Sequence, residues 1–191
     1  YIHRIVHNNA GTIMEQATAS ENWGDYLAAT VYRVFGYQML IDVLGETPYS
    51  EAQNTAITAP KYDEGKDVYA GIIGELDAAL AQVTGNELVC NNMLFLGDNS
   101  VENYIQFANA LKLRLLMRQS GAVDSKAALA SLIAEDNFPT EDIAFASSLF
   151  SNEAGKDSPL YGEIVRALGD ARANRHKEAV AHMALTSTMN A

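Results

Sequence analysis

Residues 40–52 read LIDVLGETPYSEA: an apolar segment stops at Gly45, and the chain continues through Glu-Thr-Pro-Tyr. Glycine readily adopts the left-handed conformation that ends a helix, and proline cannot continue a helix because it lacks a backbone N–H. Upstream, apolar side chains cover more than one face of residues 25–44, which is typical of a helix packed among other helices. The stretch therefore predicts the exit of a buried helix, with Pro48 just beyond it.

Helical periodicity recurs along the chain, whereas strand patterns are sparse. Residues 63–83 carry one apolar stripe, with Asp63 as the expected N-cap. A second stripe, in residues 101–118, follows a start that resembles a capping box, in which Asn99 precedes Glu102 by three residues. Weaker or shorter patterns predict helices over residues 2–17, 124–134, 159–168 and 177–189. A short apolar patch in residues 86–98 fits either a strand or a buried loop.

These segments predict an all-α fold of stacked antiparallel helical hairpins, because each apolar stripe needs an apolar partner. The two clearest hairpins begin 76 residues apart, at Asp25 and Val101, without the recurrence of about 34 residues that marks a tetratricopeptide sequence repeat. Long loops rich in Gly, Pro, Asn and Asp join the helices. From a length of 191 residues we expect a single domain, residues 1–191.

The composition argues against a nucleic-acid partner. The formal charge is −11 and the 13 basic residues are scattered, whereas binding to a phosphate backbone needs clustered Lys and Arg. Lys112, Arg114 and Arg118 form the one local group, which we interpret as cations that stabilise a helix C-terminus. The single cysteine, Cys90, cannot form an internal disulfide.

No short motif for catalysis, metal binding or cofactor binding occurs in the sequence. His3 and His7 have the four-residue spacing of zinc ligands on a helix, but Arg4 stands where a metalloprotease needs glutamate. We therefore assign both histidines to surface or capping roles. Carboxylates gather around the predicted helix exit, at Asp42, Glu46 and Glu51. A glycosidase-like acid pair there is conceivable, but solvated surface is the interpretation that we favour, so we expect no enzyme and no cofactor.

Aromatic residues near loops are the candidates for ligand contact. Planar rings flanked by polar groups are what sugar rings stack against, and Trp23, Tyr49 and Tyr62 meet that description. The alternative for each of them, and for the neighbouring Tyr26, is a ring that closes the edge of the core. We predict Trp23, Tyr49 and Tyr62 as ligand-binding residues.

Three blocks in a fixed order resemble the SusD/RagB family of nutrient-binding outer-membrane lipoproteins: LIDVLGETPYSEA, APKYDEGKDVYAGIIGELDAALA and IQFANALKLRLLMR. With the leading helix they span residues 2–118, and residues 159–161, Pro-Leu-Tyr, resemble a later stretch of that family. The lead-in to the third block, CNNMLFLGDNSVEN, departs from the acidic, glycine-rich family pattern and keeps little beyond Gly97 and Asp98.

The resemblance implies tetratricopeptide-like helical hairpins that bind an oligosaccharide or another nutrient and deliver it to a SusC-type TonB-dependent outer-membrane transporter. It also implies a location at the cell surface, on the outer membrane, through a lipid anchor that lies outside this chain. Residues 1–191 would then be a fragment of a longer lipoprotein. Residues 45–49 would form the corner between two helices, and Tyr62 and Asp63 would begin the second arm of the hairpin.

A second hypothesis, from a different class, is a helical-repeat scaffold that contacts only other proteins, because stacked helices form extended concave surfaces. A third hypothesis, a hydrolase, lacks a triad, a metal motif or an identified acid pair. Titration with sugars, peptides and small nutrients distinguishes capture from scaffolding.

Overall fold

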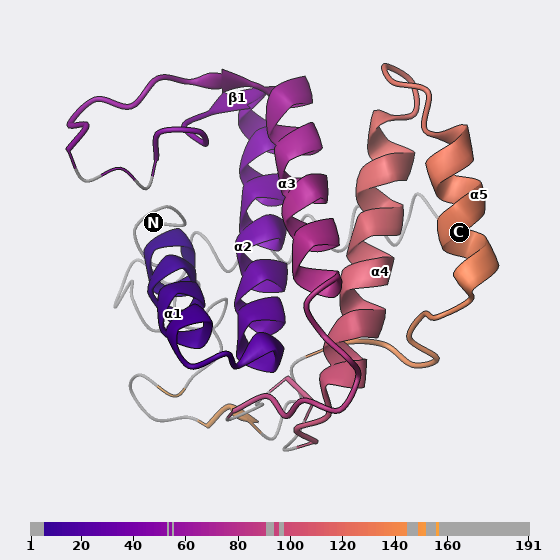
Figure 1. The fold of residues 1–191 in the computed structure, drawn as a ribbon. Helices are drawn as coiled ribbons and strands as arrows, with labels where there is room; N and C mark the ends of the chain where they lie inside the picture. The colour runs from indigo at the N-terminus through magenta and orange to yellow at the C-terminus, as the bar shows by residue number, and fades with distance from the viewer. Residues whose placement is uncertain are drawn as a thin grey trace, which may run out of the picture. The chain divides into compact units, whose positions relative to one another are not determined.

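The computed structural model describes residues 6–52, 54, 56–90, 94–95, 98–144, 149–151 and 156. The chain divides into two compact units, Tyr1–Ala144 and Phe145–Ala191, and every described helix and strand belongs to the first. Within the described residues there are five α-helices and two strands of two residues, which confirms the all-α prediction (Figure 1). The predicted helices at 159–168 and 177–189 lie outside the described residues.

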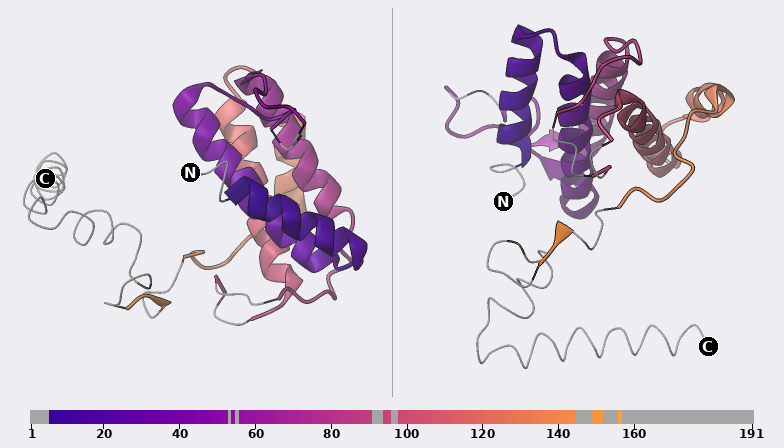
Figure 2. Two further views of the ribbon diagram at one scale, coloured as in Figure 1. Left: turned by 90° about the vertical axis from the view of Figure 1, so that its left-hand side faces the viewer. Right: turned by 90° about the horizontal axis from the view of Figure 1, so that it is seen from below.

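Five helices follow one another across the first unit in chain order (Figure 1). They are α1 (Asn8–Ala19), α2 (Trp23–Leu44), α3 (Gly65–Leu80), α4 (Val101–Gln119) and α5 (Lys126–Glu135). Between α2 and α3, β1 (Glu46–Thr47) pairs antiparallel with β2 (Asp63–Glu64), with Glu46 opposite Glu64 and Thr47 opposite Asp63. In the view from below in Figure 2, α1 and α5 lie at opposite ends of the row of helices.

The central helix is α2, which packs against α1, α3 and α4. Of the helices in the described part of the chain, it alone is long and apolar enough to cross a membrane, and 56% of that apolar window is buried inside the protein. Leu27, Val31, Val34 and Tyr37 are fully buried in the core that α2 forms with α3 and α4. Its apolar character is therefore explained by its place in the middle of the bundle.

The hairpins stack in a regular register. Gln38 of α2 contacts Arg114 of α4, and Asp42 contacts Arg118, so each contact joins positions 76 residues apart. The two helices therefore run parallel, and the offset equals the separation of the two predicted hairpin starts. Tetratricopeptide-like stacking is thus present in the geometry although the two hairpins share no sequence pattern.

The corner between α2 and α3, residues 45–49, has the helix exit at Gly45 that the sequence predicts. Gly45 has φ +79°, in the left-handed region, and its N–H donates to the carbonyl of Ile41 at 2.9 Å. Thr47 is fully buried within the short β1–β2 pair. The glycine therefore ends α2, and the proline that follows Thr47 prevents the helix from resuming.

Asp63 has a different role from the predicted N-cap. The α3 helix begins at Gly65 after Glu64, and the Asp63 carboxylate instead accepts hydrogen bonds from the corner. The backbone N–H groups of Tyr49 and Ser50 donate to it at 3.1 and 2.8 Å, and the Ser50 hydroxyl donates at 2.9 Å. The side chain therefore fastens the corner to the start of α3.

Other helix starts also differ from the sequence prediction. The N-cap of α4 is Ser100, whose hydroxyl accepts from the Glu102 N–H at 3.3 Å, so the expected capping role of Asn99 is wrong by one residue. Within the apolar patch of residues 86–98, Leu88 forms an isolated β-bridge with Ser100. Two residues further on, Cys90 has an exposed side chain, and its backbone N–H donates to the carboxylate of Asp25 in α2 at 2.7 Å.

Candidate ligand-binding site

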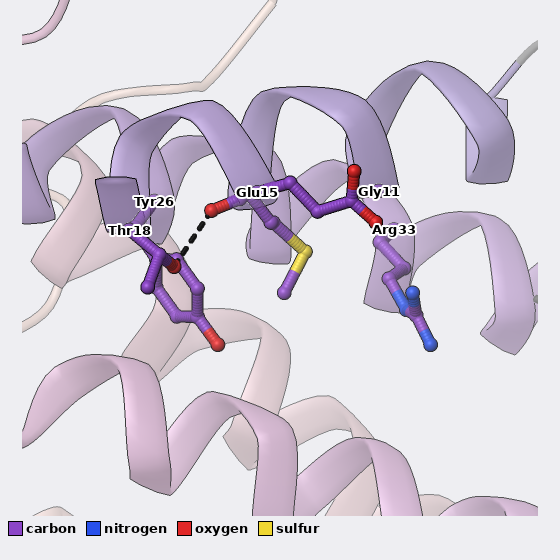
Figure 3. Close-up of a pocket in the computed structure, with 6 residues that line it drawn as sticks. Gly11, Glu15, Thr18, Tyr26 and Arg33 are labelled. Carbon is purple, nitrogen blue, oxygen red and sulfur yellow. Dashed lines mark hydrogen bonds between the residues drawn. The ribbon is translucent and has the colours of Figure 1, made fainter. Parts of the chain in front are cut away.

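A pocket lies between the first two helices (Figure 3). It has a volume of about 480 Å³, within the range of small-molecule sites. The lining residues are Gly11, Met14, Glu15 and Thr18 from α1, and Tyr26 and Arg33 from α2. The four positions on α1 follow an i, i+3, i+4, i+7 spacing and therefore share one helix face.

Tyr26 forms the aromatic end of the pocket. Its ring contacts Trp23 edge-on, with the ring centroids 5.8 Å apart and the planes at 74°. The Thr18 hydroxyl donates to the carbonyl of Met14 at 2.7 Å, as the dashed line in Figure 3 shows. Because the hydroxyl proton is used inside the helix, the Thr18 oxygen retains acceptor capacity toward a ligand.

Arg33 forms the polar end. One terminal nitrogen, Nη2, donates to Oε1 of Glu75 at 3.2 Å, and Nε lies 3.0 Å from Oε2 of the same carboxylate. The two side chains are only 14% and 21% exposed, so the pair is largely shielded from water. Among the described residues nothing accepts a hydrogen bond from the other terminal nitrogen of Arg33, which leaves donors for a ligand.

Tyr49 reaches the same carboxylate from the corner. Its hydroxyl donates to Oε1 of Glu75 at 2.8 Å, and its ring packs edge-on against Tyr37 with a centroid distance of 5.0 Å. Burial, followed by the nearby negative charge of Glu75, raises the pKa of Tyr49 above its ordinary value. The hydroxyl therefore stays protonated and acts as a donor to Glu75.

His7 also contacts the Tyr37 ring and is fully buried. The two rings stack with centroids 3.7 Å apart and planes at 18°, so a surface role for His7 is wrong. His7 does occupy the N-cap position of α1, but its side chain forms no capping hydrogen bond. His3, which has the four-residue spacing from His7, lies outside the described residues. Burial raises the pKa of Tyr37 to about 12.

The carboxylates and cations singled out in the sequence have separate structural partners. Asp42 accepts from Tyr69 and pairs with Arg118, while Glu51 accepts from the Lys61 backbone N–H at 2.9 Å. Lys112 pairs with Asp77 of α3, and Arg114 donates to Gln38 of α2. Both lie before the last turn of α4, so the predicted position at the helix C-terminus holds only for Arg118. In the described part of the chain, no group of three or more His, Cys, Asp or Glu residues could hold a metal ion.

A second pocket of about 480 Å³ lies between α2, α4 and the segment that follows α5. Phe35, Phe107 and Phe138 contribute to its walls, and Arg114 lies over the Phe35 ring at 5.5 Å from the centroid. The segment after α5 is joined to α4 by a hydrogen bond from Asn109 to the Asn137 carbonyl at 2.9 Å. This pocket is lined by both aromatic and charged residues, and it serves below as the reference for the first one.

Residues 3–184 match the SusD-like family described as "Starch-binding associating with outer membrane". The chain belongs to the SusD-like family. The match covers nearly the whole sequence and confirms the resemblance seen in its three blocks. No curated protein matches the chain.

Solved SusD-like structures share the fold. A SusD homologue from Bacteroides uniformis superposes with a TM-score of 0.71 at 22% identity, covering 83% of this chain and 33% of its own. A SusD/RagB family protein from Bacteroides thetaiotaomicron gives 0.66 at 24% identity, over 84% of this chain and 34% of its own. A chitin-binding SusD homologue from Flavobacterium johnsoniae gives 0.62 at 23% identity, over 72% and 30%. The chain thus spans about a third of the length of these SusD-like relatives.

Of the three aromatic residues predicted from sequence, Trp23 lies apart from the other two in this SusD-like fold. Trp23 is the first residue of α2 and lies beside the pocket through Tyr26. Tyr49 packs against Tyr37, fourteen residues further along α2, which is about 21 Å along a helix axis. Tyr62 precedes β2 and is 64% exposed. Tyr49 and Tyr62 both belong to the corner, since the Tyr49 N–H donates to Asp63, which directly follows Tyr62. Contact of any of the three with a ligand stays a prediction.

Sequence reasoning missed two charged residues of the pocket, Glu15 and Arg33. The signal for Glu15 was the spacing of Gly11, Met14, Glu15 and Thr18 on one face of α1. Arg33 follows Tyr26 by seven residues, which places both on one face of α2. Neither signal reveals Glu75, because that side chain comes from α3 and its contact depends on how the helices pack.

Proposed function

We propose that this chain is part of a surface receptor that binds an oligosaccharide or another nutrient without changing it and delivers it to a SusC-type TonB-dependent transporter. The observation that carries the proposal is the match of residues 3–184 to a family described as starch-binding and associated with the outer membrane. Location at the outer-membrane surface, through a lipid anchor outside this chain, is part of the same proposal. So is the assignment of residues 1–191 to one domain.

The first pocket has side chains suited to a saccharide. The Tyr26 ring offers an aromatic face for the C–H groups of a sugar, and Trp23 beside it extends that wall. Glu15 and Thr18 offer acceptors, and Arg33 offers donors, for hydroxyl groups that both donate and accept. We place the ligand here, with Trp23 as the predicted residue nearest to it.

Calorimetric titration of the whole chain with malto-oligosaccharides, chito-oligosaccharides and short peptides tests the proposal. We expect saccharide binding, weakened roughly fivefold to tenfold by Tyr26→Ala because one aromatic contact contributes about 1 kcal/mol. Phe107→Ala, in the second pocket, is the control and leaves saccharide affinity unchanged. Intact saccharides recovered after incubation agree with capture, whereas shortened ones contradict it.

A protein-interaction scaffold gives a different outcome. If no saccharide, peptide or small nutrient produces heat while the protein forms a stable complex with a SusC-type transporter, capture is wrong and the scaffold hypothesis replaces it. If Phe107→Ala weakens saccharide binding and Tyr26→Ala does not, the second pocket is the site instead.

A further inference from the structure

The first pocket is lined by one cation, Arg33, that is paired with Glu75, and by one carboxylate, Glu15, that forms no ion pair among the described residues. We infer that the pocket selects uncharged saccharides over acidic ones, and that Tyr49 supports this selection as a positioning residue. The inference rests on the proposed function, because it assumes that the pocket receives a saccharide.

Arg33 offers hydrogen bonds but little net attraction for an anion. Both of its contacts to Glu75 are close, at 3.0 and 3.2 Å, and water has limited access to the pair. An opposite charge this near cancels most of the field of the guanidinium toward a third charge. The remaining N–H groups can still donate to a neutral hydroxyl.

Glu15 adds a negative charge on the other wall. It lines the pocket from α1, and none of the described residues forms an ion pair with it. In Figure 3 its side chain extends along α1 toward Arg33. With Arg33 neutralised by Glu75, the pocket is negative, and the chain as a whole carries a formal charge of −11. A carboxylate on the ligand would therefore meet repulsion on one side without compensation on the other.

Tyr49 fixes the charge that neutralises Arg33. Its hydroxyl donates to the same oxygen, Oε1 of Glu75, that accepts from Nη2 of Arg33. The Tyr49 ring cannot easily turn away, because it packs against Tyr37 and fills the space left by the missing side chain of Gly71. The corner at residues 45–49 is therefore connected to the pocket through Glu75.

The test compares neutral and acidic oligosaccharides of equal length by calorimetry at low ionic strength, where charge effects are largest. The probes are maltohexaose, chitohexaose and hexagalacturonate. For the unmodified chain we expect at least tenfold tighter binding of one neutral probe than of hexagalacturonate. The readout is this ratio of affinities, which a general loss of folded protein does not change.

Glu75→Gln should lower the ratio at least fivefold, because Arg33 regains its charge toward the ligand. Asp77→Asn is the matched control: it removes a carboxylate from the same helix, but one that pairs with Lys112 of α4. We expect it to leave the ratio unchanged. Tyr49→Phe should lower the ratio by a smaller factor than Glu75→Gln, because it only loosens Glu75.

Glu15→Gln keeps the inference testable if Glu75→Gln fails to fold, since Glu15 is exposed and its replacement does not disturb the core. We expect it to lower the ratio at least threefold. Equal affinity of the unmodified chain for neutral and acidic probes would overturn the selection while leaving the proposed function intact. A ratio unchanged in both glutamate variants would do the same, whereas absence of any binding overturns both proposals.

Discussion

Gly71 shows how much the corner depends on one missing side chain. A Cβ atom at this position would lie 2.4 Å from Cε1 and 2.5 Å from the hydroxyl oxygen of Tyr49. Real atoms do not approach so closely, and the ring is already confined by Tyr37 and Glu75. Gly74, one turn further along the same helix, has nothing within 4 Å of the equivalent point. Gly71 therefore has no room for a side chain, whereas Gly74 in the same helix does.

Gly71→Ala is expected to lower the free energy of unfolding by about 1–3 kcal/mol, because the added methyl group displaces the Tyr49 ring. Gly74→Ala is the matched control and should raise it by up to about 1 kcal/mol, since alanine is the better helix former. Urea unfolding of both variants measures the difference. Similar changes in the two would show that the Tyr49 ring is not confined.

Tyr49→Phe is expected to lower the free energy of unfolding by about 1–2 kcal/mol, because it removes a hydrogen bond to a charged, largely shielded acceptor. Tyr62→Phe, at an exposed ring, should change it by less than about 0.5 kcal/mol. Unfolding curves in urea provide the comparison. A loss in Tyr62→Phe as large as in Tyr49→Phe would contradict the assigned contact.

At the scale of elements, the corner is a junction between two distant sequence segments. The Asp63 carboxylate accepts the backbone N–H groups of Tyr49 and Ser50, and so joins the end of the corner to the start of α3. Hydrogen bonds, first from the Ser50 backbone and then from its hydroxyl, lower the pKa of Asp63 below its ordinary value. The junction therefore depends on the ionised form of one carboxylate.

The pH dependence of stability follows from that shift. Because the pKa of Asp63 is lower in the folded than in the unfolded chain, its contribution is complete above the unfolded value, near 3.9, and is lost as the pH falls through the folded value. We expect Asp63→Asn to be less stable than the unmodified chain at pH 7. The difference should shrink as the pH approaches 3 in urea titrations, and a constant difference would contradict it.

At the scale of the whole molecule, the first unit is organised around α2. The helix contacts three others, and its parallel packing against α4 repeats at an offset of 76 residues. Burial on several faces makes its interior positions sensitive to loss of volume, whereas its last two residues, Val43 and Leu44, are 82% and 58% exposed and lie outside the core. The two ends of one helix thus differ in their contribution to stability.

Leu27→Ala is expected to lower the free energy of unfolding by about 2–5 kcal/mol, because Leu27 is fully buried and the truncation leaves a cavity. Leu44→Ala on the same helix should cost less than about 1 kcal/mol. Chemical denaturation distinguishes the two. If both variants lost equal stability, α2 would not be the centre of the core.

Much of the fold was predictable because its signals are local. The apolar stripes of residues 63–83 and 101–118 became α3 and α4, and Gly45 ends α2 as expected. One error concerns which of two neighbouring side chains caps a helix: Ser100 does so in place of Asn99. The other concerns burial: His7 lies in the core and stacks on Tyr37. The choice of cap depends on the local backbone direction, and the burial of His7 depends on its contact with Tyr37, thirty residues further along the chain.

The sequence by itself determined the presence of the described helices, the end of α2 at Gly45 and membership in the SusD-like family, because periodicity, glycine and proline act over a few neighbouring residues. Only the tertiary structure decided the pocket between α1 and α2 and its charge. Arg33, Glu75 and Tyr49 come from three separate segments, and their contacts exist only once α2, α3 and the corner have packed together. The register of packed helices is set by the whole core, which no single stretch of sequence contains.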